Sequence, residues 1–453
     1  MAKRYEKYKD SGIAWIGEMP EHWDVFPIKH LCRYEKYSVK TGPFGTQLKG
    51  DDLQESGDVI VYNQKNVIYQ RFDEVRFYVS NQKANELKSF YTQPNDFLIT
   101  SRGTIGRAAI LPNTADMGIL HPCLIALRLN RSKVLDKWLL YFINDTDCFR
   151  TGIQLASNAT TIEVIYTETL KKSLVAIPSI PEQEQIAKYL DWKCGEVDRI
   201  VEVRERQIKL LGELRTSVIS RAVTRGLNPN APLKDSGIDW IGQIPEHWEI
   251  KKVKFTGKAI IGLTYSPNDI IDKGGSIVLR STNIQNGVLD LSDKVRVNSS
   301  ISEKLKIRKG DVLLCSRNGS ASLVGKCAYI GDVLDGVTWG AFTTVLRSSM
   351  KKYLYYALNS DIMKFYLGMF STSTINQLTT GTLNNMELLI PPATEQQQIA
   401  DYLDKKTAEI DRTINKFKVQ IDKLKEYRQA LITEVVTGKI DVRGIEIPTP
   451  KNN

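Results

Sequence analysis

An internal repeat constrains this chain more than any other feature of its sequence. Residues 9–23 read KDSGIAWIGEMPEHW and residues 234–248 read KDSGIDWIGQIPEHW, so twelve of the fifteen positions are identical at an offset of 225. We call each copy a start motif. Later in each half, IAKYL at 186–190 recurs as IADYL at 399–403, at an offset of 213. Self-similarity of this kind marks a fold built from equivalent units, so we predict two halves with one common plan.

Each half ends in a long segment with a helical pattern. Residues 182–226 and 395–439 contain no proline, and their apolar side chains recur at alternating spacings of four and three. This period of 3.5 is typical of a coiled-coil seam, and at ~1.5 Å per residue each helix would be roughly 65 Å long. The predicted seam side chains are Val197, Val201, Ile208, Leu211 and Val218 in the first helix, and Ile410, Ile414, Phe417, Ile421, Leu424 and Leu431 in the second.

A helix with one bare apolar stripe needs a partner, and the other helix of the same chain is the nearest complementary one. Direct repeats leave a parallel and an antiparallel pairing open, and each helix could instead pack on its own domain. Arg204, Arg215 and Arg428 stand at seam positions, where they could snorkel at the seam edge, set the register of the pair or contact a partner. Residues 179–182, at the start of the first helix, fit a capping box with an early proline.

We predict four segments along the chain. They are a globular domain at 1–181, a helix at 182–226, a second globular domain at 227–394, and a helix with a short tail at 395–453. The globular domains carry short β-branched or alternating runs separated by turn residues, which predicts an α+β fold. The predicted strands lie at 59–62, 97–100, 124–129, 277–279 and 312–314, and the predicted short helices at 136–143 and 352–358.

Composition narrows the class of protein. The chain has 453 residues and a net charge of +10, with a pI near 9.0, which favours a polyanionic partner. Most of the positive excess lies in the globular domains, while the helices are nearly balanced. No apolar run approaches the ~20 residues of a membrane span, no signal peptide is visible, and no two of the six cysteines form a Cys-x-x-Cys pair. We therefore expect a cytoplasmic protein with reduced thiols.

No catalytic motif is complete in this sequence. Residues 319–327 (GSASLVGKC) approach a phosphate-binding loop, but five residues separate the glycines and cysteine stands where Ser or Thr should follow the lysine. His22 and His247 occupy the same place in the two start motifs, and no second ligand or nucleophile recurs beside them. We therefore expect both histidines to be structural, and the sequence gives no sign of a metal or cofactor site.

These motifs together resemble the specificity subunit of type I restriction–modification systems, over essentially the whole chain. The resemblance is carried by the two Ser-Gly-Ile-x-Trp-Ile-Gly-x-x-Pro-x-x-Trp start motifs, by GPFG at 42–45, by Pro-x-x-x-Glu-Gln-x-x-Ile-Ala at Pro178 and Pro391, and by the two long helices. It implies two target recognition domains, each of which reads one half of a bipartite, asymmetric site in double-stranded DNA. It also implies that the helices pack antiparallel as a ruler, the element that fixes the gap between the half-sites.

The resemblance further implies partners that carry the chemistry. In that family the specificity subunit docks two modification subunits, which methylate adenine using S-adenosylmethionine, and the complex recruits restriction subunits that translocate DNA using ATP. We therefore expect no cofactor in this chain, with S-adenosylmethionine, ATP and Mg²⁺ belonging to the partner subunits. An antiparallel pairing would also convert the direct repeats into a pseudo-twofold, which matches the symmetry of a DNA duplex.

Polar residues at matching places in the two halves are the candidates for DNA contact. A glycine-rich loop follows a buried strand in each half, at 102–107 and 317–326, where the backbone could approach DNA. A further basic loop at 42–49 has a counterpart at 262–266 that departs from the family pattern, and Ser/Thr segments at 157–160 and 371–374 could contact phosphate or only solvate a turn. The candidates are Lys40, Thr41, Gly42, Lys49, Lys65, Asn66, Arg102, Thr104 and Arg107 in the first half, and Arg280, Asn283, Arg317, Asn318 and Lys326 in the second.

Two other functions stay open at this point. The chain could be a stand-alone nuclease or methyltransferase fused to recognition domains, although the missing cofactor motifs argue against it. It could also be a coiled-coil adaptor without DNA contact, and each of the candidate residues could simply form a turn with solvated side chains. Turnover by the isolated chain would favour the first alternative, and the absence of a steep salt dependence would favour the second.

Overall fold

The computed structural model describes residues 3–74, 77–157, 164–332, 335–370 and 377–448. The chain forms two compact units: unit 1 comprises Met1–Val203 and Val419–Asn453, and unit 2 comprises Arg204–Lys418. Each unit therefore holds one globular domain together with half of each long helix. The unit boundaries cut through the helices, whereas the four predicted segments treat each helix as a segment of its own, and that division stays a prediction.

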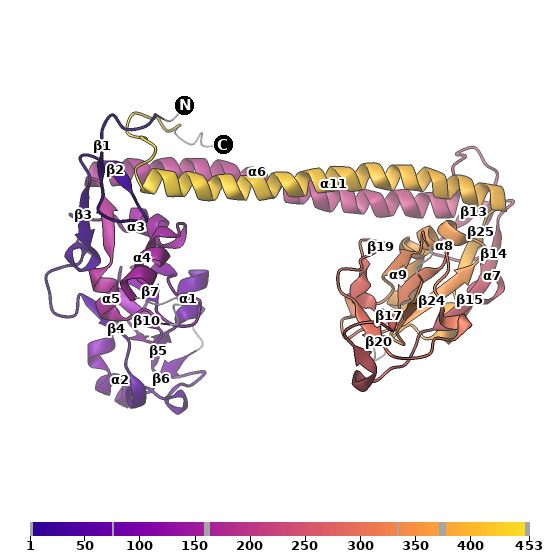
Figure 1. The fold of residues 1–453 in the computed structure, drawn as a ribbon, viewed down its shortest axis with the longest axis horizontal. Coiled ribbons are helices and arrows are strands. Elements are labelled where there is room, and N and C mark those ends of the chain that lie inside the picture. Colours follow the sequence, from indigo (N-terminus) through magenta and orange to yellow (C-terminus); the bar gives the residue numbers. More distant parts are fainter. Residues whose placement is uncertain (1–2, 75–76, 158–163, 333–334, 371–376, 449–453) are drawn as a thin grey trace. The chain divides into compact units, whose positions relative to one another are not determined.

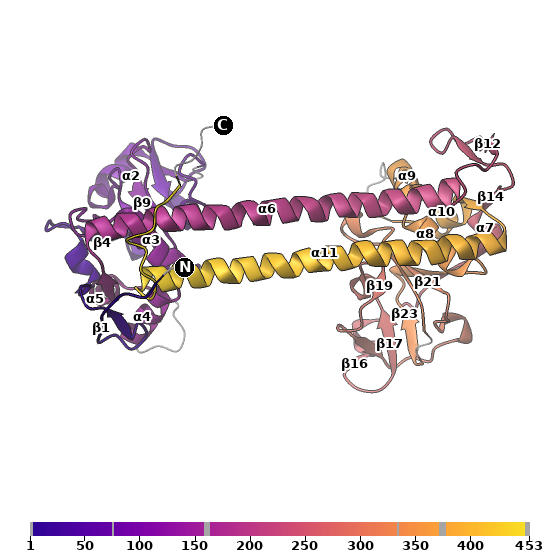
Figure 2. The same cartoon turned by 90° about the horizontal axis from the view of Figure 1, so that it is seen from above.

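Two long helices pair antiparallel within both units. Helix α6 spans Ile180–Arg225 and helix α11 spans Ala393–Val436, so each begins two residues before its predicted start. In unit 1, Arg428 Nε of α11 lies 3.4 Å from Asp198 Oδ1 of α6. In unit 2, Arg215 Nε of α6 lies 3.1 Å from Asp411 Oδ1 of α11. The early part of α6 thus meets the late part of α11 and the reverse, and Figures 1 and 2 show the helix halves of each unit side by side.

These two ion pairs are equivalent under the repeat. Arg215 and Arg428 correspond at an offset of 213, and so do Asp198 and Asp411. Each arginine forms an ion pair with the aspartate contributed by the other repeat, as a pseudo-twofold between the two helices requires. The predicted antiparallel coiled coil and its pseudo-twofold repeat are confirmed, and the parallel pairing is excluded.

The seam is the buried face of both helices. All eleven predicted seam side chains lie at buried or half-buried positions. Arg204, which interrupts the seam, places its guanidinium carbon 4.6 Å from the ring centroid of Phe417, so a cation–π contact occupies this seam position. A second set of apolar side chains on α6 is exposed by 46% to 55%, namely Ile200, Val203, Leu210 and Leu214.

The globular domain of unit 1 is built on two small sheets. The strands are β4 (Val39–Thr41), β5 (Val59–Tyr62), β6 (Tyr78–Val79), β7 (Phe97–Thr100), β8 (Ala108–Ile110), β9 (Ile119–Leu120) and β10 (Leu124–Leu127). One sheet is antiparallel in the order β4-β10-β7-β8, and the other has the order β6-β5-β9 with β5 and β9 parallel. Every residue of β7 and β10 is buried, which is why both strands are continuous apolar runs in the sequence.

The globular domain of unit 2 follows the same plan. Its strands are β15 (Gly257–Ile261), β16 (Ile270–Ile271), β17 (Ser276–Leu279), β20 (Val295–Val297), β21 (Val312–Cys315), β22 (Cys327–Tyr329), β23 (Val337–Trp339) and β24 (Thr343–Ser348), with a hairpin of β18 (Ile284–Gln285) and β19 (Val288–Leu289). The orders are β15-β24-β21-β22 and β16-β20-β17-β23, again with one parallel pair, β17 with β23. The α+β prediction and the five predicted strands are confirmed.

Short helices complete both domains. In unit 1 they are α1 (Gln64–Tyr69), α2 (Asn81–Glu86), α3 (Asp136–Asn144), α4 (Cys148–Ser157) and α5 (Thr167–Lys172). In unit 2 they are α7 (Val253–Thr256), α8 (Lys351–Leu358), α9 (Asp361–Phe370) and α10 (Thr380–Asn385). Both predicted short helices are found, as α3 and α8. They dock on the long helices in the same way, because Tyr141 of α3 donates to Asp191 at 2.9 Å and Tyr356 of α8 donates to its equivalent Asp404 at 2.5 Å.

Each start motif forms a hairpin that leads into the domain next to a long helix. The hairpins pair β1 (Tyr8–Asp10) with β2 (Glu18–Pro20), and β12 (Leu233–Asp235) with β13 (Gln243–Pro245). The next strand then pairs with the strand before the long helix, β3 (Asp24–Pro27) with β11 (Leu174–Ile177), and β14 (Glu249–Lys252) with β25 (Glu387–Ile390). Trp23 and Trp248, which close the start motifs, are fully buried. The repeated sequence thus marks the place where domain and helix are joined.

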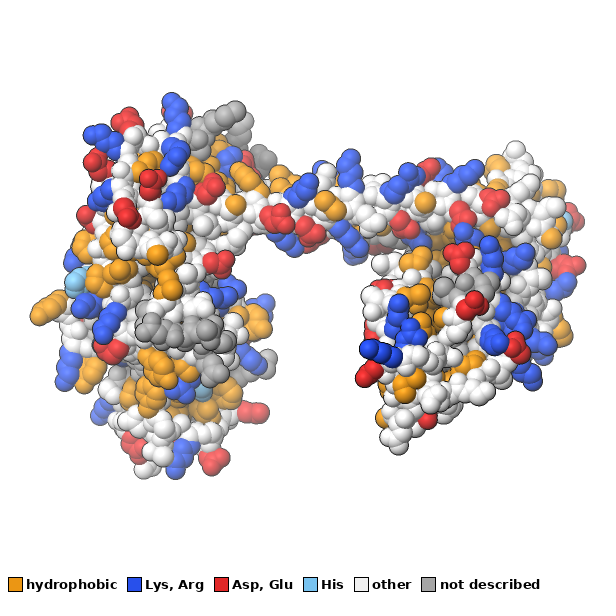
Figure 3. Space-filling view, in the orientation of Figure 1, with side chains coloured by type: hydrophobic (Ala, Val, Ile, Leu, Met, Phe, Trp, Pro, Cys, Tyr) orange, Lys and Arg blue, Asp and Glu red, His pale blue; other side chains and the backbone are white. Residues whose placement is uncertain are grey.

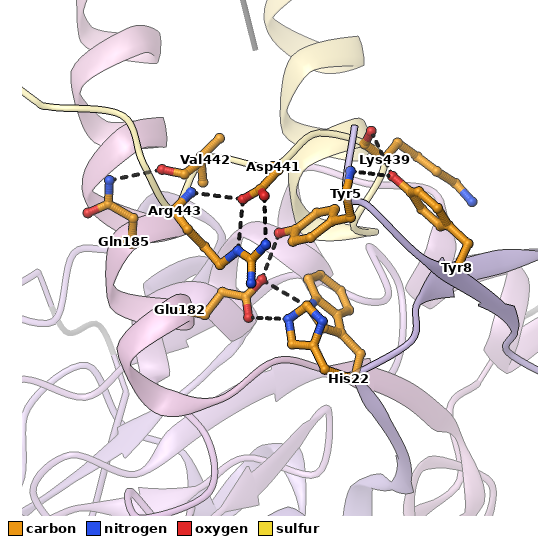
Figure 4. A network of polar contacts seen from close by, with 10 residues as sticks. Tyr5, Tyr8, His22, Glu182, Gln185, Lys439, Asp441, Val442 and Arg443 are labelled. Carbon is orange, nitrogen blue, oxygen red and sulfur yellow. Dashed lines mark hydrogen bonds and ion pairs between the residues drawn. The ribbon is translucent and has the colours of Figure 1, made fainter. Parts of the chain in front are cut away.

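A buried carboxylate at the start of α6 joins the start motif to the helix (Figure 4). Glu182 Oε1 accepts from the Tyr5 hydroxyl at 2.7 Å and from Trp23 Nε1 at 3.0 Å, and Oε2 lies 2.8 Å from His22 Nε2. In unit 2, Glu395 Oε2 similarly lies 2.7 Å from His247 Nε2 and accepts from Trp248 Nε1 at 3.1 Å.

These contacts decide two predictions. Both start-motif histidines bond a glutamate at a helix start, so their structural role is confirmed. The predicted capping box at 179–182 is confirmed in its position, because α6 begins at Ile180, directly after Ser179. Its reciprocal bond is wrong, because the Glu182 carboxylate bonds the distant start motif instead of the backbone of Ser179.

The segment after α11 packs on the first residues of the chain within unit 1. Asp441 and Lys3 form a β-bridge, in which Asp441 N donates to Lys3 O at 2.7 Å. Gln185 of α6 donates to the carbonyls of Val442 and Ile445 at 3.0 and 2.7 Å. Arg443 bonds both oxygens of Asp441 and lies over the Tyr5 ring, with its guanidinium carbon 4.9 Å from the ring centroid. Figure 4 shows Asp441 and Arg443 above Glu182, next to the Tyr5 ring.

Candidate DNA interface

One arginine holds the same backbone position in both domains. Arg102 comes two residues after β7 and Arg317 two residues after β21, and both side chains are exposed. The residue before each arginine accepts a hydrogen bond from the chain near the domain's last helix, Ser101 O from Ile165 N and Ser316 O from Leu378 N, both at 2.8 Å. Each arginine also forms a β-bridge, Arg102 with Val164 and Arg317 with Gln377. A fixed backbone therefore presents one cationic side chain to solvent in each domain.

The loops that follow these arginines differ between the domains. In unit 1, Thr104 and Arg107 are exposed, and Arg107 Nη1 donates to the Asn144 carbonyl at 3.0 Å. The turn uses Gly103 and Gly106 with φ of +70° and +69°, a left-handed conformation that suits glycine. In unit 2 the loop is longer: Asn318 donates to Ser281 Oγ at 3.1 Å and Lys326 is half-buried. The loops thus offer different donors on the same scaffold.

The two aligned asparagines are structural, which corrects their place among the candidates. Asn66 is 3% exposed, and its amide donates to the carbonyls of Arg71 and Glu74 at 2.8 and 3.1 Å, while its oxygen accepts from Asn63 N. Asn283 is 1% exposed, and its amide donates to the carbonyls of Asp290 and Asp293 at 2.8 and 2.7 Å. Both amides are buried and fully bonded to backbone, so they shape their loops and have no free donor for a base.

The side chains of three further candidates form hydrogen bonds within the protein, which is a second correction. Lys40 is 8% exposed, its ammonium donates to the carbonyls of Ser89 and Tyr91, and burial lowers the pKa of Lys40 to about 8. Thr41 shares a hydrogen bond with the hydroxyl of Thr167. Arg280 donates to Asp293 Oδ2 at 2.6 Å. These side chains stabilise the domains, and a sequence pattern cannot distinguish such internal contacts from contacts with DNA.

The loop at Gly42 has a structural equivalent at Gly262. A Cβ atom on Gly42 would overlap the carbonyl oxygen of His121, and one on Gly262 would overlap the carbonyl oxygen of Gly340. Both glycines therefore let the chain at the end of β4 or β15 pass close to the chain that enters β10 or β24, although the two loop sequences differ. Gly42 is buried and stands there for packing, whereas Lys49 and Lys65 are exposed.

The exposed surface combines positive and apolar side chains. Of the fourteen candidates, the exposed members are Lys49, Lys65, Arg102, Thr104, Arg107 and Arg317, and they stay predictions. Figure 3 shows blue Lys and Arg side chains interspersed with orange apolar ones on the visible face of each globular domain. Phe44 and Phe342, which are not among the fourteen candidates, lie beside Arg102 and Arg317. Within the Ser/Thr segments, residues 158–160 and 371–374 lie outside the described residues.

Among the residues that the structure describes, no three His, Cys, Asp or Glu side chains converge in a way that could hold a metal ion. None of the helices there is long and apolar enough to cross a membrane.

Comparison with known proteins places the chain in a family. The family model described as "Type I restriction modification DNA specificity domain" matches twice, at residues 20–208 and 245–421. The specificity subunit of the type I restriction enzyme EcoKI from Escherichia coli K12 is 31% identical over 207 residues, which is 44% of each chain. The putative MjaX specificity subunit from Methanocaldococcus jannaschii is 23% identical and covers 94% of this chain and 96% of its own.

Solved structures show the same fold. A chain of a type I R-M system, studied for its complex assembly and conformational transition, has a TM-score of 0.67 at 15% identity, covering 92% of this chain and 98% of its own. The HsdS subunit from Thermoanaerobacter tengcongensis has a TM-score of 0.51 at 16% identity, covering 93% of this chain and 98% of its own. The chain belongs to the type I restriction–modification DNA specificity family, and it is a DNA-recognition subunit whose methyltransferase partners carry the catalysis.

Proposed function

We propose that the loops headed by Arg102 and Arg317 each read one of two unlike DNA half-sites. The observation that carries this proposal is the shared backbone position of the two exposed arginines, held by equivalent hydrogen bonds in both domains. A guanidinium can bond O6 and N7 of guanine in the major groove or a phosphate oxygen, and fixed backbone reduces the cost of ordering it. The loops differ in length and sequence beyond the arginine, which supports two different half-sites.

The second apolar stripe of α6 supports a docking place for the methyltransferase partners. Leu210 and Leu214 in unit 2 are about half exposed, and they lie beside the seam at the same alternating spacing. A helix with apolar side chains on two adjacent stripes can pack on two neighbours at once, as in a four-helix bundle. We propose that two modification subunits dock on the long helices in the cytoplasm, and that these and further restriction subunits hold S-adenosylmethionine, ATP and Mg²⁺.

Replacing Leu210 and Leu214 together by aspartate should weaken binding of the modification subunit at least about tenfold, because two charges would enter an apolar contact. The seam is untouched, so the helical content measured by circular dichroism should stay the same. Lys209→Gln changes the net charge of an exposed site on another face of this helix, and it should bind the modification subunit like the wild type. Equal affinity of the Leu210/Leu214 double variant and the wild type in calorimetry would contradict this docking place.

Salt dependence of DNA binding tests the recognition function. With the modification subunits bound, affinity for DNA should fall steeply as salt rises, because several phosphate contacts release counterions. The double variant Lys49→Gln/Lys65→Gln should bind more weakly at all sequences and with a shallower slope, by about one for each phosphate that is no longer neutralised. A flat salt dependence of the wild-type complex would favour the adaptor alternative. Methylation by the chain alone, given DNA and S-adenosylmethionine, would favour the stand-alone enzyme.

A further inference from the structure

Each domain places an exposed phenylalanine against its exposed arginine. The guanidinium carbon of Arg102 lies 5.4 Å from the ring centroid of Phe44, and that of Arg317 lies 5.5 Å from the ring centroid of Phe342. The phenylalanines are 51% and 63% exposed. A single exposed aromatic side chain needs no explanation. The same pair beside the equivalent arginine in both domains does need one, because the surrounding loops differ in length and sequence.

The two phenylalanines come from different loops. Phe44 follows β4, two residues after Gly42, and the equivalent place in unit 2 is Thr264, two residues after Gly262. Phe342 precedes β24, and its carbonyl accepts from Ser316 N at 3.1 Å. In unit 1 the carbonyl that accepts from the equivalent Ser101 N belongs to Cys123, at 2.7 Å. Neither aromatic is therefore inherited from the common plan, yet each domain has one beside its arginine.

Both phenylalanines are held in place through their backbones. Phe44 N donates to Gln47 Oε1 at 3.0 Å, and Gln47 N donates to Phe44 O at 3.1 Å, which closes a tight turn. The Phe342 carbonyl also accepts from Arg317 N at 3.0 Å, so this phenylalanine is tied directly to the arginine that it contacts. A ring that is fixed in this way restricts the directions in which a flexible arginine side chain can point.

We propose that Phe44 and Phe342 are positioning residues for base readout, which rests on the proposed function of the arginine loops. Each ring attracts the guanidinium by a cation–π contact and leaves the fork of donors free to bond a guanine edge in a defined direction. Orienting the arginine before DNA binds reduces the entropy lost on binding the correct base pair. The phenylalanines thus increase discrimination at the base pairs that the arginines read.

The test uses the complex of the full chain with its modification subunits. The recognised site is first mapped from the methylated positions in DNA, and competitor duplexes then carry each base pair of both half-sites changed in turn. Phe44→Leu should lower discrimination roughly two- to fivefold, as expected for the loss of an exposed cation–π contact, at the base pairs where Arg102→Gln lowers it further. Phe44→Tyr, which keeps the ring, should retain discrimination. The double variant Phe44→Leu/Arg102→Gln should discriminate as well as Arg102→Gln alone.

Phe342→Leu provides an independent second instance, because it should affect only the other half-site, at the base pairs read by Arg317. Phe255→Leu is the matched control: Phe255 is 71% exposed and contacts Lys254 on α7 instead of a loop arginine, and the substitution should leave every base-pair preference unchanged. Since phenylalanine carries no charge, DNA binding by Phe44→Leu and by Phe342→Leu should depend on salt with the same slope as in the wild type.

Three results would overturn the inference. The first is unchanged discrimination in Phe44→Leu. The second is a loss of discrimination at base pairs that Arg102 does not read, as expected of a ring inserted between base steps. The third is a loss of affinity that is uniform across all sequences. Failure of the proposed function looks different, because Arg102→Gln and Arg317→Gln would then discriminate among the duplexes like the wild type. If the two arginine variants lose discrimination while Phe44→Leu and Phe342→Leu both keep it, only the positioning role is rejected.

Discussion

Glu182→Ala is expected to lower the free energy of unfolding of unit 1 by about 3–5 kcal/mol, the range observed when one partner of a buried polar network is removed. The Glu182 side chain is 4% exposed and receives hydrogen bonds from Tyr5, His22 and Trp23. Without the carboxylate, the Tyr5 hydroxyl and the Trp23 indole N–H would be buried donors with no acceptor. The junction between start motif, α6 and the segment after α11 would lose the group on which its contacts converge.

The repeat supplies a matched control for this substitution. Glu395 makes the same contacts with His247 and Trp248, but its side chain is 21% exposed, and within the described ranges no tyrosine hydroxyl bonds to it. Because water can reach this carboxylate and only one fully buried donor depends on it, Glu395→Ala should cost about 1–2 kcal/mol. The same chemical change should therefore have a clearly larger effect in unit 1 than in unit 2.

Hydrogen exchange measures the two units separately in one chain. In Glu182→Ala, amides of residues 8–23 and 439–445 should exchange faster, while those of the second start motif should exchange as in the wild type. In Glu395→Ala the pattern should be reversed and weaker. Equal and small effects of the two substitutions in both exchange and denaturant unfolding would show that the Glu182 network does not stabilise unit 1.

The sequence predicted those parts of the fold whose signal is local and periodic. Strands β5 and β7 were placed at their observed bounds, because each is a short apolar run between turn residues. The seam followed from a spacing of four and three over several turns of helix. The spacing alone left the pairing direction open. The family resemblance implied antiparallel helices, and the ion pairs of Arg215 with Asp411 and of Arg428 with Asp198 confirm that direction.

The sequence could not separate side chains that face DNA from side chains that hold a loop. Asn66 and Asn283 were candidates because they occupy matching positions in the two halves. They match because each domain needs a buried amide that bonds the backbone of its loop. Lys40 is a buried lysine whose acceptors, the carbonyls of Ser89 and Tyr91, lie about fifty residues along the chain. Phe44 and Phe342 were missed as a pair, because they occupy positions that do not align. All of these roles depend on contacts between residues that are far apart in the sequence.

Removing one matched heptad from both long helices should abolish recognition of the original site. Deleting Arg204–Leu210 from α6 together with 412–418 from α11 keeps the seam period, and these segments face each other because Arg204 contacts Phe417. The ruler would shorten by about 10 Å, or about three base pairs of DNA. Since B-DNA makes one turn in 10–10.5 base pairs, the second half-site would also be turned by about 100° relative to its recognition domain.

Methylation of the original site should therefore fall at least about 100-fold, because misplacing one half-site removes several base-pair interactions of ~1–3 kcal/mol each. Any sites that are still methylated should keep both half-sites and have a shorter gap between them. Deleting 204–210 alone shifts the register between Arg215 and Asp411, so this variant should unfold at lower temperature, whereas the matched deletion should melt close to the wild type. A stable matched deletion that still methylates the original site with its original gap would mean that the helices do not set the spacing.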